Sequence, residues 1–134
     1  MKLMLDQKAI ESIDIFQTIT GSSVVDCLLE EDCIYFIVKE GQYGLTVGKG
    51  GIKIKNAERV FKKTIKVFEY APTSEEFLKK ILPDVQDIAN RDNMILIKVS
   101  PKDRSRIIGK AGKNIKILNK ILQRLFDVQE LKVK

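Results

Sequence analysis

The fold of this chain is decided by the segment Ile107-Ile108-Gly109-Lys110-Ala111-Gly112-Lys113-Asn114-Ile115. The same pattern occurs 61 positions earlier, as Thr46-Val47-Gly48-Lys49-Gly50-Gly51-Ile52-Lys53-Ile54. An ungapped shift of 61 residues keeps apolar positions in register on both sides of the glycines, and it pairs Ile34 with Ile95 and Val67 with Val128. Agreement over most of the chain indicates one domain that has been duplicated. We therefore predict two domains, at 1–70 and 74–134, with a short linker at 71–73.

The size of each copy limits its stability and its class. Two units of about 60 residues lie near the lower limit for an independent hydrophobic core, so we expect the halves to pack into one rigid unit. The hydrophobic content of 44% suits a globular protein. No apolar run approaches the roughly 20 residues that span a bilayer, and the N-terminus lacks the layout of a signal peptide. The sequence predicts a soluble, cytoplasmic protein without a membrane partner.

Metal and catalytic chemistry find few suitable residues in this chain. It contains no histidine and only two cysteines, Cys27 and Cys33, which lie within apolar, strand-like segments. A structural zinc site takes four Cys or His ligands, and histidine is also the most frequent general base. We expect buried free thiols, no metal or other cofactor, and no enzymatic activity.

Positive charge is concentrated toward the C-terminus. Residues 1–46 contain 3 basic and 8 acidic side chains, residues 47–97 contain 10 and 7, and residues 98–134 contain 11 and 3. The excess of cations starts at the first glycine segment and grows through the second, as in proteins that bind polyanions. Charge alone more often marks an ordinary solvated face, so the prediction of polyanion binding depends on the glycine motifs.

Hydrophobic periodicity predicts alternating helices and strands in the first copy. Apolar residues at helical spacing from Leu5 to Phe16 predict a helix that ends near Thr20-Gly21. Two apolar runs around a polar turn then predict a hairpin, and a longer helix follows the glycines. The expected strands are 24–29, 33–38 and 65–70, the expected one-turn helix is 45–47, and the buried side of the longer helix carries Ile54, Ala57, Val60 and Phe61.

The second copy predicts the same order of elements. A capped helix starts at Ser74, and the helix after Gly112 has an apolar stripe at three- and four-residue spacing. The stripe consists of Ile115, Leu118, Ile121, Leu122 and Leu125, and the expected strands are 85–89, 94–99 and 127–133 with a turn at 91–93.

Each Gly-x-x-Gly segment can bind a phosphate. Glycine has no β-carbon, so the backbone can approach a phosphodiester closely, and the following helix directs N–H groups and the positive end of its dipole to the same place. A nucleotide-binding P-loop is excluded by spacing, because it requires glycine where the chain has Tyr43 and Arg104, and Ser or Thr where it has Gly50 and Ala111. For each loop taken alone, a simple turn between two helices is the alternative.

The order strand, short helix, Gly-x-x-Gly, helix, strand, with isoleucine three positions after the last glycine, resembles the KH domain, which binds single-stranded nucleic acid. Both copies fit, although Ile52 replaces a polar residue in the first. The resemblance implies an α+β fold of two tandem type II KH domains, each a three-stranded mixed sheet packed on helices. With Gly41-Gln42-Tyr43-Gly44-Leu45-Thr46-Val47-Gly48 in the first copy and Pro101-Lys102-Asp103-Arg104 ahead of the second loop, the tandem is similar to the NusA family in its short archaeal form.

That resemblance implies an RNA-binding factor of transcription termination or antitermination. In KH domains about four nucleotides cross a narrow groove, with the RNA backbone toward the Gly-x-x-Gly loop and the bases toward an aliphatic wall. Because the wall positions are not aromatic, stacking should contribute little. They are Val47, Ile54 and Ile65 in the first copy and Ile108, Ile115 and Val128 in the second. The alternative for each of these residues is a place in the hydrophobic core, which is the more frequent role of such a residue taken singly. The residues expected to bind RNA are Gly48, Lys49, Gly50, Gly51, Lys53, Lys55, Arg104, Arg106, Ile108, Gly109, Lys110, Ala111, Gly112, Lys113 and Ile115.

Two other functions are compatible with the same features. A KH protein of translation or ribosome assembly would use the same grooves for RNA, and a structural adaptor would use them for protein. A salt-dependent affinity for unstructured RNA would exclude the adaptor, and co-purification with RNA polymerase rather than ribosomal subunits would separate the first two. The expected partners are single-stranded RNA and RNA polymerase, and the chain is expected to be a monomer.

Overall fold

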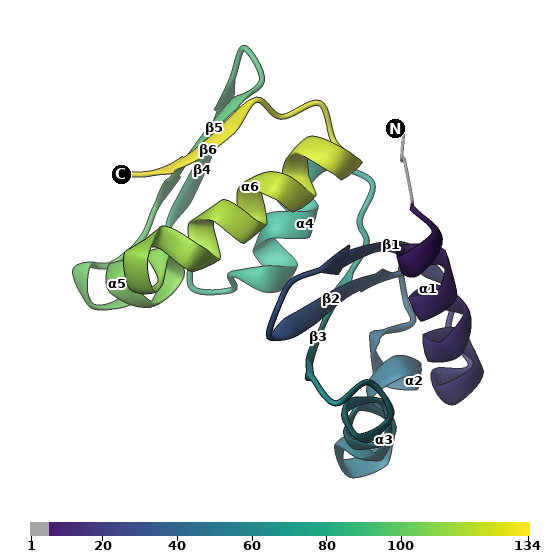
Figure 1. Cartoon of the computed structure of the whole chain (residues 1–134). Coiled ribbons are helices and arrows are strands. Elements are labelled where there is room, and N and C mark those ends of the chain that lie inside the picture. The colour runs from purple at the N-terminus through teal and green to yellow at the C-terminus, as the bar shows by residue number, and fades with distance from the viewer. Residues whose placement is uncertain (1–5) are drawn as a thin grey trace. The chain divides into compact units, whose positions relative to one another are not determined.

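A computed structural model describes residues 6–134 of the chain. The predicted helical residue Leu5 and the first residues of the predicted domain 1–70 lie outside the described residues. The described chain divides into two compact units, and the boundary falls between Pro72 and Thr73. Each unit has its own three-stranded sheet and its own helices (Figure 1).

The first unit, which ends at Pro72, has a mixed sheet. Strand β1 pairs antiparallel with β2, and β2 pairs parallel with β3, so β2 is central and β3 is an edge strand. Its elements are α1 (Gln7–Thr20), β1 (Val24–Leu29), β2 (Cys33–Val38), α2 (Tyr43–Val47), a 3₁₀ turn (Lys49–Gly51), α3 (Ile52–Phe61) and β3 (Thr64–Glu69).

Local sequence explains where α1 begins and ends. The Asp6 side chain accepts a hydrogen bond from the Ala9 amide and caps the N-terminus. Gly21 ends the helix in the left-handed region at φ 75°, a conformation that glycine adopts without steric cost. Phe16 of α1 stacks on Phe36 of β2, with ring centroids 3.8 Å apart, and this pair lies in the core between helix and sheet.

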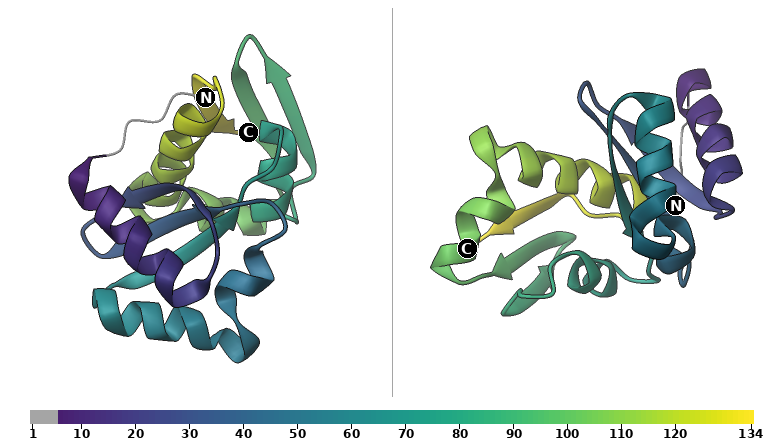
Figure 2. Two further views of the ribbon diagram at one scale, coloured as in Figure 1. Left: turned by 90° about the vertical axis from the view of Figure 1, so that its right-hand side faces the viewer. Right: turned by 90° about the horizontal axis from the view of Figure 1, so that it is seen from below.

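The second unit, from Thr73 onward, repeats this topology. Strand β4 pairs antiparallel with β5, and β5 pairs parallel with β6. Figure 2 shows both sheets from two further directions. The elements are α4 (Ser74–Ile81), β4 (Asp87–Arg91), β5 (Met94–Lys98), α5 (Pro101–Ile108), a 3₁₀ turn (Lys110–Gly112), α6 (Lys113–Leu125) and β6 (Glu130–Val133).

The predicted α+β fold, with three-stranded mixed sheets packed on helices, is confirmed. Two strand boundaries were predicted too early. Strand β4 begins at Asp87 rather than Val85, because the Val85 amide closes a turn on the Leu82 carbonyl before the ladder starts. Strand β6 begins at Glu130 rather than residue 127, because the Val128 amide closes another tight turn on the Phe126 carbonyl after α6.

The ungapped register of the repeat is wrong in the last strand. Cys33 pairs with Thr64, whereas Met94, its equivalent, pairs with Glu130, so the shift has grown from 61 to 66 residues. Helix α6 has 13 residues against 10 in α3, and the connection to the following strand is also longer. The structural equivalent of Val67 is therefore Val133 rather than Val128.

The predicted burial of Val60 is also wrong. Its side chain is 57% exposed, whereas Ala57 is fully buried and Ile54 and Phe61 pack against the core. Successive residues of an α-helix are rotated by about 100°, which places Ile54 and Phe61 on one side of Ala57 and Val60 on the other. The first core therefore uses a narrower helical stripe than the apolar letters suggest.

Two simpler expectations concern cysteine and the membrane. Cys27 and Cys33 are buried, as predicted, and they do not form a disulfide. Within residues 6–134, none of the helices combines the length and the apolar character that crossing a bilayer requires.

Candidate nucleic-acid interface

The two Gly-x-x-Gly loops have nearly the same backbone conformation. Gly48 has φ 77° and ψ 168°, and Gly109 has φ 79° and ψ 169°. The last glycines, Gly51 and Gly112, both lie in the left-handed region, at φ 75° and 73°. The duplication therefore extends to the conformation of the loops, at residue positions where positive φ favours glycine.

The first glycine of each loop is also required by close packing. A β-carbon on Gly48 would lie 2.8 Å from Cγ of Lys53. A β-carbon on Gly109 would lie 2.8 Å from Cγ of Asn114 and 2.9 Å from its backbone nitrogen. The start of the following helix thus packs directly against the bare backbone of the loop.

The third position of each loop is conformationally demanding but spatially open. Gly50 has φ 64°, and no atom lies within 4 Å of the place where its β-carbon would be. Ala111 occupies the equivalent position at φ 55°. A left-handed conformation costs a non-glycine residue about 1–2 kcal/mol, so the second loop contains strain that the first avoids.

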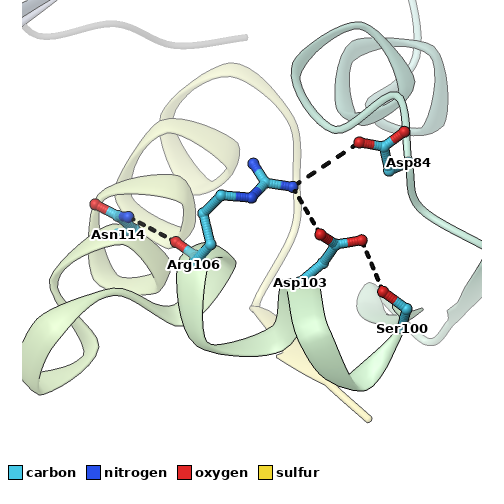
Figure 3. A network of polar contacts seen from close by, with 5 residues as sticks. All are labelled: Asp84, Ser100, Asp103, Arg106 and Asn114. Carbon is cyan, nitrogen blue, oxygen red and sulfur yellow. Dashed lines mark hydrogen bonds and ion pairs between the residues drawn. The ribbon is translucent and has the colours of Figure 1, made fainter.

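Lys53 and Asn114 occupy equivalent positions and tie each loop down. The Lys53 ammonium donates to the carbonyl of Thr20 at 2.8 Å and to that of Leu45 at 3.1 Å. The Asn114 amide donates to the carbonyl of Arg106 at 2.9 Å (Figure 3), and Arg106 is the equivalent of Leu45. In both units, one side chain after the loop therefore fixes a carbonyl of the short helix before it.

A groove of about 460 Å³ lies between α3 and the edge strand β3 of the first unit. The predicted wall residues Val47, Ile54 and Ile65 all line it. Lys55 stands at its border. Tyr43, which the sequence pattern did not place at the groove, also lines it. The remaining lining residues are Gly51, Glu58, Lys66, Val67 and Phe68.

The open edge of β3 offers backbone groups to this groove. The amide of Thr64 donates to the carbonyl of Asp32, just before β2, and the amide of Tyr70 to that of Val38, the last residue of β2. Alternate residues of β3 therefore face β2, and those between them face outward. The outward amide of Ile65 is satisfied by a Glu58 carboxylate oxygen at 3.1 Å. Val67 is then the next residue along the edge whose N–H and C=O both point away from the sheet.

The second unit has the same arrangement at its open edge. The Leu131 amide donates to the side-chain oxygen of Asn119 at 2.7 Å, and the Asn119 side-chain nitrogen donates to the Leu131 carbonyl at 3.2 Å. Leu131 is the equivalent of Ile65. The equivalent of the groove residue Ile65 is therefore Leu131 and not Val128, which lies in the turn before β6 and is buried, as its alternative role in the core predicts.

Arg106 is held only loosely next to the second loop. Its guanidinium lies 3.6 Å from a carboxylate oxygen of Asp103 and 4.0 Å from one of Asp84 (Figure 3), and its side chain is 61% exposed. The Ser100 hydroxyl donates to Asp103 at 2.7 Å, and this bond is the main reason that the pKa of Asp103 is lowered. Exposed ion pairs of this kind contribute about 0–1 kcal/mol, so a phosphate can replace the carboxylates at little cost.

The other predicted cations differ in their surroundings. Lys49 and Lys110 are exposed in the turns of the two loops, and Lys55 and Lys113 are exposed on the helices that follow. Arg104 is exposed too, and its Nε donates to the Lys134 carbonyl at 3.4 Å. Lys53 is half-buried, and its ammonium donates to two carbonyls.

Comparisons with known proteins agree with this geometry. The family model described as "KH domain" matches residues 12–85. The chain is 34% identical to the "Probable transcription termination protein NusA" of Methanocaldococcus jannaschii, over 98% of this chain and 75% of that protein. The protein of the same name from Methanococcus vannielii is 35% identical, over 99% of this chain and 80% of its own length.

Similarity also holds over complete chains and in three dimensions. The NusA-named protein of Halobacterium salinarum is 28% identical, and the match covers 99% of both chains. The crystal structure of the protein APE1850 is similar with a TM-score of 0.81 and 31% identity, covering 97% of this chain and all of that one. The likeness therefore includes both units and is not confined to the glycine loops.

Proposed function

Since this chain belongs to the KH domain family and, within it, to the archaeal NusA-like termination proteins, we propose that it is a transcription factor that grips single-stranded RNA with both Gly-x-x-Gly loops. In this proposal each compact unit is a type II KH domain. The family match covers the first unit, and the second has the same strand order, parallel pairing and loop dihedral angles. This shared loop geometry is the observation that carries the proposal.

Each loop holds the RNA backbone with amides and cations. The first residues of a helical turn leave N–H groups without an intrahelical acceptor, which makes the amides of Lys49 and Gly50 the first phosphate donors. Lys110 and Ala111 supply them in the second loop. The dipoles of α3 and α6 favour a negative charge at the same points, and the exposed Lys55, Arg104, Arg106 and Lys113 add Coulomb attraction.

The bases lie against the aliphatic wall and the open strand edge. In the first groove, Val47 and Ile54 cover one face of a base. The outward N–H and C=O of Val67 can donate to and accept from its Watson–Crick edge. Val133 has the equivalent place in the second groove. Glu58 and Asn119, by satisfying the preceding edge amide, leave these valines as the reading positions.

Introducing a negative charge inside each loop tests the proposal. Gly50→Asp and Ala111→Asp place a carboxylate where the phosphate should sit. Asp tolerates the left-handed conformation better than most residues, and the space around Gly50 is open. Gly50→Asn and Ala111→Asn are matched controls because Asn has nearly the same shape without the charge.

Binding of a labelled single-stranded RNA pool is measured by fluorescence anisotropy. We expect each Asp variant to bind substantially more weakly than its Asn control, and RNA of about eight nucleotides to bind better than RNA of about four if both loops grip one strand. Equal binding by the Asp and Asn variants at both loops would refute the phosphate grip.

The role in transcription has a separate test. Addition of the protein to transcription reactions with the cognate archaeal RNA polymerase should change the fraction of transcripts that end at a terminator. The double Asp variant should lose that effect. Association with ribosomal subunits, together with no change in termination, would reassign the protein to translation or ribosome assembly.

A further inference from the structure

The two loops are surrounded by chemically different side chains. At three equivalent positions the first unit has Tyr43, Leu45 and Ile52, where the second has Arg104, Arg106 and Lys113. These apolar side chains are not core residues, because they are 50%, 47% and 57% exposed. The same backbone geometry therefore presents an apolar rim in the first unit and a cationic rim in the second.

The net charge of the two units differs in the same sense. Residues 1–72 contain 10 basic and 10 acidic side chains, whereas residues 73–134 contain 14 and 8. The whole formal charge of +6 thus belongs to the second unit. In the first unit the ammonium of Lys53 is in addition bound to two carbonyls. Long-range attraction of RNA is therefore concentrated at the second unit.

Tyr43 is placed to contact a base in the first groove. It lines the groove together with Val47 and Ile54 and keeps half of its surface exposed. Its backbone is fixed, because it opens α2 and its amide donates to a Glu69 carboxylate oxygen at 3.1 Å. The Tyr43 side chain has neither a hydrogen bond nor a ring contact within residues 6–134, and half of the residue is exposed, so the ring is accessible to a ligand.

We infer that Tyr43 is a base-stacking residue, and that the first groove binds RNA mainly through base contacts while the second binds mainly through phosphates. This inference rests on the proposed RNA-binding function. RNA is the occupant that the charges of the groove favour, because the cations Lys55 and Lys66 outnumber the one acidic lining residue, Glu58, and attract a polyanion. An aromatic side chain accepts any base on its π-face.

Substitutions of Tyr43 in the full chain separate stacking from simple apolar contact. Tyr43→Phe keeps the ring, Tyr43→Leu keeps an apolar side chain without a ring, and Tyr43→Arg copies the second unit. With single-stranded RNA of about eight nucleotides, Tyr43→Leu should bind about 5- to 150-fold more weakly, whereas Tyr43→Phe should bind within about twofold of the parent. An abasic ribose-phosphate chain of equal length should bind the parent and Tyr43→Leu equally.

Salt dependence and fluorescence give two independent readouts. Tyr43→Leu should leave the slope of log affinity against log salt unchanged. Tyr43→Arg should make that negative slope steeper by about 0.7, because one more phosphate is neutralised. The chain has no tryptophan and 3 tyrosines, so a variant with Tyr35→Phe and Tyr70→Phe leaves Tyr43 as the only tyrosine. Its emission should be quenched when RNA binds.

Three outcomes have distinct meanings. RNA binding that Tyr43→Leu leaves within about twofold, with no quenching of Tyr43, overturns the inference but not the proposed function. No RNA binding by the parent chain overturns the proposed function itself. Unchanged RNA binding together with loss of a protein contact in Tyr43→Leu would assign the apolar rim to a protein partner, which also refutes stacking.

Discussion

Lys53 and Lys49 lie four residues apart at the first loop, but methionine in place of each should change a different property. Lys53→Met should lower the stability of the fold, and Lys49→Met should weaken RNA binding. The Lys53 ammonium bonds to the carbonyls of Thr20 and Leu45 at 2.8 and 3.1 Å. Hydrogen bonds with a charged partner contribute about 1.5–3 kcal/mol each, and partial exposure to solvent reduces this. We expect Lys53→Met to lower the free energy of unfolding by about 2 kcal/mol. Lys49→Met should change it by less than about 0.5 kcal/mol, as is usual for a surface substitution.

The salt dependence of RNA binding should change in Lys49→Met and not in Lys53→Met. If Lys49 neutralises a phosphate, its loss lowers the slope of log affinity against log salt by about 0.7. Lys53→Met should leave that slope unchanged, because the ammonium is already occupied within the protein. The variants are compared by the salt dependence of their affinity for RNA, because weaker folding of the loop also lowers the affinity at any single salt concentration.

Urea denaturation followed by circular dichroism and a salt series of anisotropy titrations measure the two quantities. With a slope of about 1 kcal/mol per molar urea for a small unit, the midpoint for Lys53→Met should fall by about 2 M. Lys53→Asn should recover part of the loss, because Asn114 makes the equivalent bond in the second unit. An unchanged urea midpoint together with a reduced salt slope for Lys53→Met would refute the reasoning and make Lys53 a phosphate contact.

Three further predictions concern stability and pH. Gly109→Ala should lower the free energy of unfolding by at least about 2 kcal/mol, because its β-carbon would lie 2.8 Å from a neighbouring atom at φ 79°; Ala111→Gly should change it by less than about 1 kcal/mol in urea denaturation. The pKa of Asp103 is lowered from 3.8, first by the Ser100 hydroxyl and then by nearby cations. The contribution of ionised Asp103 to the stability of the fold is therefore complete above pH 3.8 and is lost as the pH falls through the lowered pKa. Ser100→Ala should raise the pKa of Asp103 in an NMR titration. Burial, followed by Cys33 and nearby acidic groups, raises the pKa of Tyr35 from 10.0 to about 12, so stability should decline as the pH rises between these values, and Tyr35→Phe should weaken that decline in alkaline urea denaturation.

The sequence predicted the elements that depend on local signals. Gly21 ends α1 and the strands 24–29 and 33–38 have the predicted bounds, because caps, turns and short apolar runs act over a few positions. The repeat also predicted two equivalent Gly-x-x-Gly loops, and the structure gives them nearly the same conformation. The repeat failed after α6, because a longer helix and connection change the register without changing the pattern of apolar residues.

The candidate site was only partly predictable for the same reason. Val47, Ile54 and Ile65 line the groove as expected, since their spacing places them beside the loop. Tyr43 was missed because it belongs to the short helix before the loop, and its position at the groove depends on how α2 packs. The exposure of Val60 could not be predicted from its being apolar, because the position of the sheet determines which side of α3 is buried.

By itself the sequence determined the duplication, the two glycine loops, the gradient of positive charge and the absence of histidine. These are properties of composition and of short-range backbone preference, so they can be recognised from the amino-acid sequence alone. Only the tertiary structure decided that Lys53 bonds to a carbonyl 33 residues away, that Leu131 rather than Val128 is the equivalent of Ile65, and that Tyr43 borders the first groove. Each of these depends on packing between segments distant in the chain, which determines the neighbouring atoms that a polar or aromatic side chain reaches.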